Sequence, residues 1–417
     1  MTARELTVRL LNKTFGANGF SNIVIGSAFV GTDISDADKN FCTALYYGVI
    51  ERKITLDHII SGYYKKEKMD LTVRNILRCG MFQLKYMDSI PESAAINESV
   101  KLTRKLGVSS TSGLVNAILR QFTRDSLKIP EPVTEPVKYS APQSLIDMLK
   151  QAYGEEETVG FLDNSFQKPP VFLRLNTFVN AEIPESFKES PILPQCYEFS
   201  GNFLATDAYK NGLFYVQNLS SQLCAVALDP KPGDTVLDLC AAPGGKSFTL
   251  SQLMGGKGII HAFDLHENRV KLIKNGAKHL NIPNITVKCG NSAEYNENIP
   301  FADKILCDVP CSGLGVIRRK PEIKYREYAQ ELPELQYKIL SNAAKYLNSG
   351  GELVYSTCTL NPCENEKVTE RFLLEHTDFK GIGFLKDLGE PFGNYTATVL
   401  PRHFNSDGFF IAKFTKI

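Results

Sequence analysis

Long apolar stretches are missing from this chain of 417 residues. No run reaches the roughly 20 residues of a membrane-spanning helix, and the opening MTARELTVRLL lacks the apolar centre of a secretory signal. Hydrophobic residues make up 43% and charged residues 22%, which is ordinary for a globular protein and excludes a disordered chain. We therefore expect a cytoplasmic protein that contacts no membrane.

The chain also lacks the cysteine and histidine spacings of metal sites. The closest cysteine pairs, Cys307 with Cys311 and Cys358 with Cys363, have spacings of C-x3-C and C-x4-C instead of the C-x2-C of zinc knuckles. The six histidines form no ligand spacing. Without a secretory signal, the ten cysteines are better interpreted as reduced thiols than as a disulfide framework. We expect no metal and no assembly beyond a monomer.

Charge is unevenly distributed along the chain. Through Lys128 there are 18 Lys and Arg against 12 Asp and Glu, whereas the remainder holds 29 against 34. The basic front part is the better candidate for contact with a polyanion.

Residues 1–126 predict an all-α domain. Ser35 and Asp38 resemble a capping box, and the apolar residues behind them recur every four positions. Pro91 opens a second predicted helix, which Gly107 closes. No strand-like alternation competes with the helical pattern.

Proline then marks a connection. Residues 127–142 contain four prolines and no periodic apolar pattern, which predicts an extended interdomain linker. Residues 143–212 combine short helical stretches with the alternating PPVFLRLNTF and predict a small α+β subdomain.

From residue 213 to 417, strand, glycine-rich turn and helix alternate. The predicted strands are 235–240, 258–264, 285–289, 302–308, 351–358 and 408–414. This alternation predicts an α/β domain with a doubly wound sheet, whose site lies at the carboxyl ends of the strands.

The first of these turns reads DLCAAPGGKS, residues 238–247. Its small residues let a ligand approach the backbone at a helix N-terminus. A phosphate loop would need glycine where Cys240 stands, and the G-x-G-x-x-G fingerprint is missing. Asp264 ends the second predicted strand, where a carboxylate can accept both hydroxyls of a ribose. The alternative is that Asp264 caps the following helix.

Two cysteine-containing stretches follow the fourth and fifth predicted strands. DVPCSGLG holds Asp308 and Cys311, and YSTCTLNPCENE holds Cys358. Two thiols and a carboxylate at one sheet edge suit methylation at carbon 5 of a cytosine, because carbon 5 is not nucleophilic until a thiolate attacks carbon 6. The alternative is two buried cysteines without chemistry.

The motifs DLCAAPGGK, DVPCSG and STCT, in this order, resemble the RNA (cytosine-5)-methyltransferases of the Nol1/Nop2/Sun family. The helical front part resembles the antitermination factor NusB. GLVNAILRQF and the final LPRHFNSDGFFIAKF also resemble the members that modify bacterial small-subunit (16S) ribosomal RNA. The likeness covers nearly the whole chain and implies a NusB-like RNA-binding domain followed by a Rossmann-like, S-adenosylmethionine-dependent methyltransferase domain.

The resemblance also implies residue roles. Cys358 would be the nucleophile and Cys311 the thiol that assists product release, with Asp308 where cofactor and target base meet. The implied cofactor contacts are Cys240, Ala241, Ala242, Pro243, Gly244, Gly245, Lys246, Asp264, Arg269, Asn291 and Asp308. Asn291 stands where the family usually has aspartate and would contact the adenine through an amide instead of a carboxylate. Cys363 stands where an acidic residue is usual and receives no role.

RNA contact is expected at the basic stretch that follows the Cys311 loop. This stretch contains Arg318, Arg319, Lys320, Lys324 and Arg326, gathered around an aromatic residue. Lys65, Lys66 and Lys68 form a second basic cluster, for which an ordinary solvated surface is equally reasonable.

Three alternatives stay open beside the ribosomal RNA substrate. A transfer RNA substrate would use the same chemistry, and the motifs do not separate the two. A non-catalytic RNA-binding assembly factor is disfavoured by the intact Cys311, Cys358 and Asp308. A nucleotide-dependent oxidoreductase is disfavoured by the glycine pattern.

Overall fold

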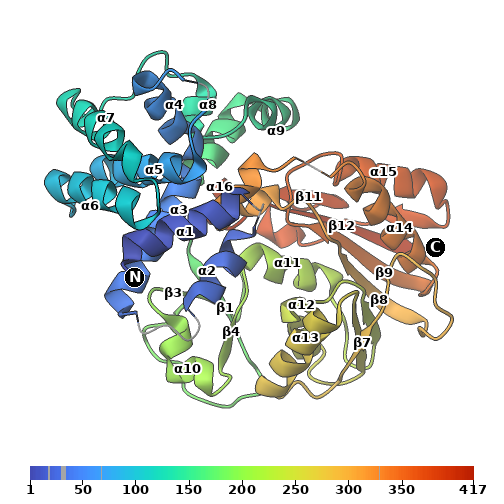
Figure 1. The fold of residues 1–417 in the computed structure, drawn as a ribbon. Coiled ribbons are helices and arrows are strands. Elements are labelled where there is room, and N and C mark those ends of the chain that lie inside the picture. Colours follow the sequence, from blue (N-terminus) through green and yellow to red (C-terminus); the bar gives the residue numbers. More distant parts are fainter. Residues whose placement is uncertain (17–18, 30–33, 67, 328) are drawn as a thin grey trace. The chain divides into compact units, whose positions relative to one another are not determined.

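The computed structural model describes residues 1–16, 19–29, 34–66, 68–327 and 329–417 (Figure 1). The chain forms two compact units. The first, the helical unit, holds Met1–Phe166 together with Arg319–Arg326; the second, the sheet unit, holds Gln167–Arg318 and Glu327–Ile417.

The described part of the helical unit contains no strand, which agrees with the all-α prediction for residues 1–126. Its α-helices are α1 (Ala3–Gly16), α2 (Ser21–Phe29), α3 (Asp36–Glu51), α4 (Lys53–Tyr63), α5 (Leu71–Tyr86), α6 (Glu92–Lys105), α7 (Ser112–Arg124), α8 (Glu135–Tyr139) and α9 (Gln143–Asn164). The 3₁₀ helices are η1 (Ser109–Thr111) and η4 (Pro321–Tyr325). The predicted caps are confirmed: Ser35 accepts a hydrogen bond from the Asp38 backbone N–H, and Pro91 directly precedes α6.

The compact units differ from the predicted division of the chain. The proline-rich stretch is not extended throughout, because α8 forms within it and docks on α4: the Thr55 hydroxyl donates to the Val137 carbonyl at 2.6 Å, and the Ile54 N–H donates to Ser140 Oγ at 3.0 Å. Helix α9, predicted as part of the small α+β subdomain, follows α8 into the helical unit.

The sheet unit begins with a small antiparallel sheet. Its strands are β1 (Val171–Leu175), β2 (Lys188–Glu189), β3 (Cys196–Phe199) and β4 (Phe214–Val216), in the order β2-β3-β1-β4. The short helices η2 (Phe203–Ala205) and α10 (Asp207–Lys210) precede β4.

The larger sheet has the order β10-β12-β9-β8-β5-β6-β7, with β11 beside β12. Its strands are β5 (Thr235–Asp238), β6 (Ile259–Asp264), β7 (Ile285–Cys289), β8 (Ala302–Asp308), β9 (Leu347–Thr357), β10 (Phe379–Gly381), β11 (Thr396–Val399) and β12 (Phe409–Lys416). Strands β5 to β9 pair in parallel and β12 pairs antiparallel with β9. The predicted doubly wound sheet is therefore confirmed.

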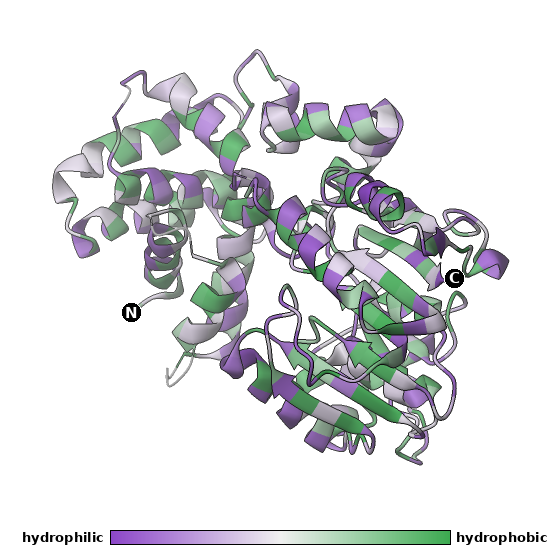
Figure 2. Ribbon diagram, turned by 90° about the vertical axis from the view of Figure 1, so that its right-hand side faces the viewer, coloured by the Kyte–Doolittle hydropathy of each residue, from purple (hydrophilic) through white to green (hydrophobic). Residues whose placement is uncertain are grey.

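Helices cover both faces of this sheet. They are α11 (Leu219–Leu228), α12 (Gly245–Leu253), α13 (Glu267–His279), α14 (Leu332–Ala344), α15 (Glu366–Glu375) and α16 (Pro401–Phe404), with η3 (Leu314–Val316) and η5 (Lys386–Leu388) in connections. Figure 1 shows α11, α12 and α13 on one side and α14 and α15 on the other. Strand residues alternate between the faces: Leu353 and Tyr355 pack with the α14 side, and Val354 with the α11 side. The strands accordingly carry much of the hydrophobic colour in Figure 2.

The order of the parallel strands locates the site. Connections from β5 run toward β6 on one side, whereas β8 lies on the other side of β5. Ligands bind outside the carboxyl ends of the strands at such a reversal. Asp238 and Asp308, the last residues of β5 and β8, lie at this point.

Candidate active site

A cavity of about 380 Å³ opens at the carboxyl ends of the parallel strands. It brings together, from the residues predicted for the site, Cys240, Ala242, Asp264, Arg269, Asn291, Asp308, Cys311 and Cys358. The parallel register explains the meeting, because Asp308 of β8 pairs with Ser356 of β9, two residues before Cys358. The thiols therefore share one cavity with the proposed ribose carboxylate.

The two thiols are in direct contact. Cys311 Sγ and Cys358 Sγ lie 3.1 Å apart, within hydrogen-bond distance for sulfur. The hydrogen bond with Cys358 and then burial raise the pKa of Cys311 well above its usual value. Cys311 consequently keeps its proton at neutral pH.

Glu364 braces both thiol loops, and the sequence analysis did not single it out. Its buried carboxylate accepts hydrogen bonds from the Ser312 N–H at 2.9 Å, the Ser312 hydroxyl at 2.6 Å, Gln336 Nε2 at 2.9 Å and Asn361 Nδ2 at 2.9 Å. Ser312 follows Cys311 directly, and Asn361 lies three residues beyond Cys358. The only sequence signal was its place in NPCENE, next to the exposed Cys363.

Gly315 lets three backbone segments meet behind the thiols. Its N–H donates to the Cys358 carbonyl at 2.9 Å, and its own carbonyl accepts from the Gly408 N–H at 2.9 Å. A Cβ at position 315 would lie 2.0 Å from the Gly408 carbonyl oxygen. The glycine therefore fixes the loop that carries Cys311 to the start of β12.

Lys246 and Asp308 form an ion pair at 2.7 Å. Asp308 also accepts from the Ser356 hydroxyl at 2.8 Å. Burial alone would lower the pKa of Lys246, but the attraction of Asp308 outweighs it and raises the pKa above its usual value, with Cys358 as a smaller cause in the same direction. Lys246 is thus a fixed positive charge beside the carboxylate.

The loop 240–246 is held against the neighbouring strand. The Ala241 N–H donates to the Phe263 carbonyl at 2.8 Å, and Gly244 adopts a φ of +113°, which favours glycine. The loop leads into the N-terminus of α12 at Gly245. Behind it, burial raises the pKa of Asp238 to about 7 although the Ser247 hydroxyl donates to that carboxylate at 2.6 Å.

Asp264 does not cap α13. It accepts from the Ala242 N–H at 3.2 Å and the His266 N–H at 3.3 Å, whereas His266 is the N-cap and makes no side-chain cap bond. Arg269 pairs with Asp264 at 3.3 Å and donates to the Ala242 carbonyl at 2.9 Å. Asn291 lines the same cavity and donates to Glu294 at 2.7 Å.

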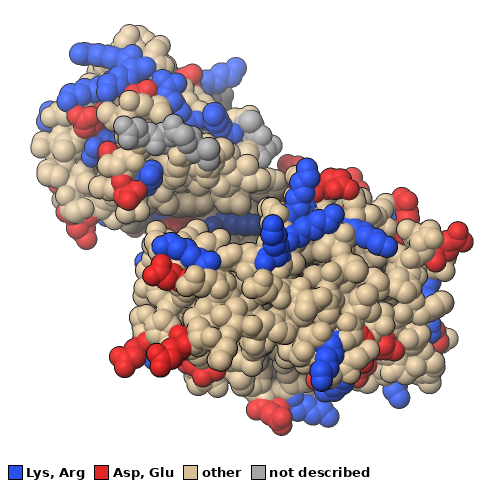
Figure 3. All heavy atoms as spheres, turned by 90° about the horizontal axis from the view of Figure 1, so that it is seen from below, with Lys and Arg blue, Asp and Glu red and all other residues tan. Residues whose placement is uncertain are grey.

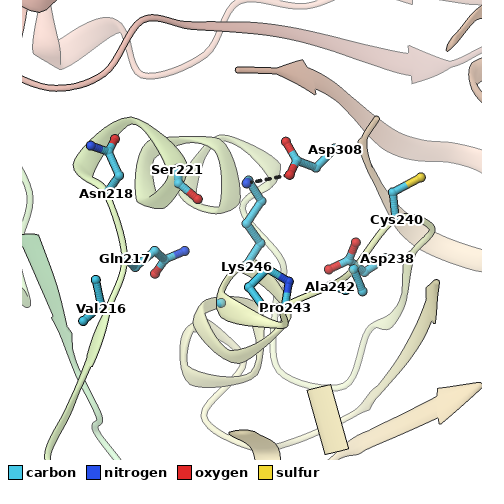
Figure 4. Close-up of a pocket in the computed structure, with 12 residues that line it drawn as sticks. Val216, Gln217, Asn218, Ser221, Asp238, Cys240, Ala242, Pro243, Lys246 and Asp308 are labelled. Atoms are coloured by element: carbon cyan, nitrogen blue, oxygen red, sulfur yellow. Dashed lines mark hydrogen bonds and ion pairs between the residues drawn. The ribbon is translucent and has the colours of Figure 1, made fainter. Parts of the chain in front are cut away.

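A second cavity of about 200 Å³ lies between the 240–246 loop and the start of α11 (Figure 4). It contains Gln217, Asn218 and Ser221, which the sequence analysis missed, facing Lys246 and Asp308. Their signal was weak, because a polar QN pair before an apolar helix is also an ordinary N-cap, and Asn218 does cap α11.

Side chains of the basic stretch predicted for RNA contact make contacts within the protein. Lys324 is 1% exposed and donates to the Glu51 carbonyl at 3.0 Å, and burial lowers its pKa to about 7. Arg326 donates to the Gly19 carbonyl and covers the Phe20 ring at 3.8 Å. The prediction of Lys324 as an RNA contact is therefore wrong, because η4 docks into the helical unit.

The other three residues of that stretch are divided between the two units. Arg318 belongs to the sheet unit and donates to the Gln167 and Lys168 carbonyls at 3.0 and 2.6 Å. Arg319 and Lys320 are half-buried members of the segment that belongs to the helical unit. Their part in RNA contact stays a prediction.

The described ranges contain neither a candidate metal site nor a candidate membrane-spanning helix. No group of three or more His, Cys, Asp and Glu side chains there could hold a metal ion. Within those ranges, too, every helix is too short or too polar to cross a bilayer. All ten cysteines are free thiols.

These features define a Rossmann-like methyltransferase domain that follows a helical domain. Residues 225–415 match the family described as 16S rRNA methyltransferase RsmB/F, and residues 1–124 match the NusB family. The probable ribosomal RNA small subunit methyltransferase B of Bacillus subtilis (strain 168) is 34% identical over 442 residues, covering 100% of this chain and 99% of that protein. The corresponding protein of Photorhabdus laumondii is 31% identical, covering 99% and 98%. The chain belongs to the ribosomal RNA small subunit methyltransferase B family.

Solved structures agree with this assignment. The crystal structure of PH0851 matches with a TM-score of 0.83 at 26% identity, covering 100% of this chain and 99% of that one. NSun6 from Pyrococcus horikoshii, solved with the S-adenosylmethionine analogue SFG, matches with a TM-score of 0.60 at 24% identity over 66% of this chain and 98% of that one. The resemblance drawn from the sequence is confirmed by the family matches and the curated relatives.

Proposed function

We propose that this chain transfers a methyl group from S-adenosylmethionine to carbon 5 of a cytosine in small-subunit (16S) ribosomal RNA, through a covalent cysteine adduct at carbon 6. The observation that carries the proposal is the pair of touching thiols, Cys311 and Cys358, in one cavity with Asp308 and Asp264. Methylation of a nucleophilic nitrogen or oxygen would need no such pair. Family membership supports the ribosomal RNA substrate.

The described residues fit S-adenosylmethionine at both ends. Asp264 suits the ribose hydroxyls, and Asn291 lies beyond it for the adenine. At the other end, two buried amide nitrogens, Gln217 Nε2 and Asn218 Nδ2, have no hydrogen-bond partner among the described residues and line the second cavity. Such donors suit a carboxylate, and Asp238 in the same cavity suits an ammonium group.

The amide of Gln217 is oriented by its surroundings. The Tyr215 hydroxyl lies 2.9 Å from Thr249 Oγ1, and the Thr249 hydroxyl donates to Gln217 Oε1 at 2.7 Å. This chain of hydroxyls fixes the oxygen of the amide away from the cavity and leaves Nε2 facing it. When bound, S-adenosylmethionine supplies an electrophilic methyl group.

In the proposed reaction, the Cys358 thiolate forms a bond to carbon 6, and the electron pair of the 5,6 double bond moves through carbon 4 to nitrogen 3. The neighbouring Lys246 ammonium favours the thiolate, since Cys358 is among the groups that raise the pKa of Lys246. Nitrogen 3 takes a proton through the Lys246 and Asp308 pair, and carbon 5 becomes an enamine carbon that accepts the methyl group.

In the release step, the bond between the Cys358 sulfur and carbon 6 breaks. The Cys311 thiol passes its proton to the departing Cys358 sulfur, which lies 3.1 Å away, as the bond from sulfur to carbon 6 breaks. As carbon 5 gives up its proton to the resulting Cys311 thiolate, its C–H electron pair restores the 5,6 double bond and expels the Cys358 sulfur, and the proton on nitrogen 3 returns to the Lys246 and Asp308 pair. Cys311 ends as the thiol it was at the start, whereas Cys358 ends as a thiol and loses that proton, the one that the methylation releases, before the next turnover.

An adduct assay tests these roles. Wild type, Cys311→Ala, Cys358→Ala and the exposed control Cys363→Ala are incubated with 16S ribosomal RNA and S-adenosylmethionine, followed by denaturing gels and analysis of the RNA nucleosides. We expect a trapped adduct only with Cys311→Ala, no 5-methylcytosine with Cys358→Ala, and normal product with Cys363→Ala. Trapping by Cys358→Ala alone would reverse the two roles.

The same assay separates the alternatives. If 5-methylcytosine forms in transfer RNA but not in ribosomal RNA, the substrate is transfer RNA. If no variant traps RNA and wild type binds no S-adenosylmethionine in calorimetry, the chain is a binding factor and the enzymatic proposal fails.

A further inference from the structure

The helical unit contains a cavity of about 630 Å³ that the proposed chemistry does not use. It lies between the N-terminal turns of α4 and α5, next to Phe15 at the end of α1. Its charged lining consists of the cations Lys53, Lys68, Arg74 and Arg78 and the carboxylates Asp57 and Asp70. Cations thus outnumber carboxylates in the wall by two.

Both carboxylates are already engaged within the wall. Asp57 holds Arg78 with two hydrogen bonds, from Nε at 2.8 Å and from Nη2 at 2.6 Å. Asp70 caps α5 by accepting from the Thr72 and Val73 N–H groups at 2.8 and 3.1 Å. The positive charge of Arg78 is therefore balanced by Asp57, whereas the three other cations face only the charge of Asp70 and leave an excess of two positive charges in the wall.

Three cations are left over, the exposed Lys68 and the half-buried Lys53 and Arg74. In the parts of the chain that the structure describes, neither Lys53 nor Arg74 forms an ion pair with a carboxylate. Lys53 instead lies over aromatic rings, 4.8 Å from the Tyr325 centroid and 5.8 Å from that of Phe15. Burial lowers the pKa of Lys53, and the positive charges of Arg78 and Arg74 act in the same direction, while Asp57 offsets part of this decrease. Cations held close together in excess over the carboxylates beside them favour the binding of an anion.

We propose that this cavity binds phosphate groups of the RNA substrate, with Lys53 and Arg74 as the contacting residues. The inference rests on the RNA substrate of the proposed function. Arg74 offers a planar fork to phosphate oxygens and Lys53 a point charge. Arg78 shapes the wall through its pairing with Asp57, and Lys68 at the rim adds to the attraction. Lys65 and Lys66, which belonged to the same predicted basic cluster, do not line the cavity. Figure 3 shows Lys and Arg side chains gathered on one face of the protein with few acidic neighbours, so the test must separate this cavity from general basic charge.

The test compares full-length variants of equal charge in binding to a 16S ribosomal RNA transcript. Lys53→Gln with Arg74→Gln removes two cations from the cavity, and Lys101→Gln with Lys105→Gln removes two exposed cations from α6 as the matched control. For each protein, the dissociation constant is measured by fluorescence anisotropy at several salt concentrations. Lys53→Arg with Arg74→Lys conserves the charge and serves as the rescue variant.

We expect the cavity variant to bind roughly tenfold more weakly at physiological salt. Its slope of log affinity against log salt should become shallower by about 1.4, because each lost phosphate contact on a single strand contributes about 0.7. The control and rescue variants should keep both values near wild type. Thermal unfolding of every variant checks that the helical unit remains folded.

The inference is overturned if the cavity variant, folded as wild type, keeps the wild-type affinity and slope, or if the α6 control loses as much. Failure of the proposed function is a separate result: wild type would then form no 5-methylcytosine on the same transcript. If wild type makes the product and the cavity variant binds RNA as tightly as wild type, the proposed phosphate site fails and the proposed function stands.

Discussion

Replacement of Glu364 tests whether one buried carboxylate holds the two thiol loops together. Its oxygens divide their partners: one faces the Ser312 N–H and Gln336 Nε2, and the other faces the Ser312 hydroxyl and Asn361 Nδ2. In Glu364→Gln the amide oxygen can keep the first pair, while the Ser312 hydroxyl and the Asn361 amide can turn to accept from the new NH₂ group. In Glu364→Ala, all four donors lose their acceptor.

The magnitudes follow from this division. A hydrogen bond to a charged group contributes about 1.5 to 3 kcal/mol, and a buried donor left unpaired costs about 1 to 3 kcal/mol. We expect Glu364→Gln to lower the free energy of unfolding of the sheet unit by about 2 kcal/mol and Glu364→Ala to lower it by about 4 kcal/mol. For a unit of this size, the second change corresponds to a melting temperature lower by roughly 8 to 16 °C.

Thermal unfolding and the rate of 5-methylcytosine formation are measured together on both variants. The matched control is Glu334→Gln, which breaks an exposed ion pair with Arg371 and should cost less than about 1 kcal/mol. Glu364→Gln should form product more slowly than wild type at a temperature where both are folded, because the thiols are less firmly placed. If Glu364→Ala melts with the control and forms product at the wild-type rate, the bracing role is refuted.

Three further predictions follow from single contacts. Gly315→Ala should abolish product formation, because the added Cβ would lie 2.0 Å from a backbone oxygen. The control Gly113→Ala adds a Cβ that meets nothing within 4 Å and should raise the free energy of unfolding by about 0.4 to 1 kcal/mol. Activity assays and melting curves of both variants check these outcomes. Because burial raises the pKa of Asp238 to about 7, far above its unfolded value, its protonated form stabilises the fold, and stability should fall as pH rises from about 4 to 7. Asp238→Asn should flatten that decline in denaturant titrations, and an unchanged pH profile would contradict the assignment. Gln217→Leu should weaken S-adenosylmethionine binding about tenfold in calorimetry, because the buried donor is lost, and an unchanged affinity would remove Gln217 from the site.

The sequence predicted those parts of the site that depend on local order along the chain. Asp264 and Asp308 end their strands and Cys358 directly follows β9, and parallel strands bring their carboxyl ends to one edge regardless of the details of packing. The capping of α3 by Ser35 was predictable for the same reason, since the partner lies three residues away.

Roles that depend on distant partners were not predictable. Glu364 braces Ser312 from 52 positions away, and no local pattern encodes that distance. Lys324 failed in the opposite way: the basic composition of its segment indicated a surface, but the same segment also carries Glu322, which accepts from the Ser21 N–H and hydroxyl at 3.0 and 2.7 Å and anchors it in the helical unit. The amino-acid composition of a segment shows its charge, but it does not show which of its side chains become buried in the folded protein.

The membership of residues 319–326 in the helical unit has a consequence for biosynthesis. The chain passes between the two units three times, at residues 166, 318 and 326. Although the helical unit is the first to emerge during translation, it stays incomplete until the strands β5 to β8 have been made, so Tyr325 can reach the Ser140 carbonyl, 3.0 Å away in the finished fold, only late. A fragment ending at residue 166 would therefore lack part of the helical unit, and the residues that contact Glu322 and Tyr325 would be exposed to solvent. A fragment meant to represent the helical unit must also include residues 319–326.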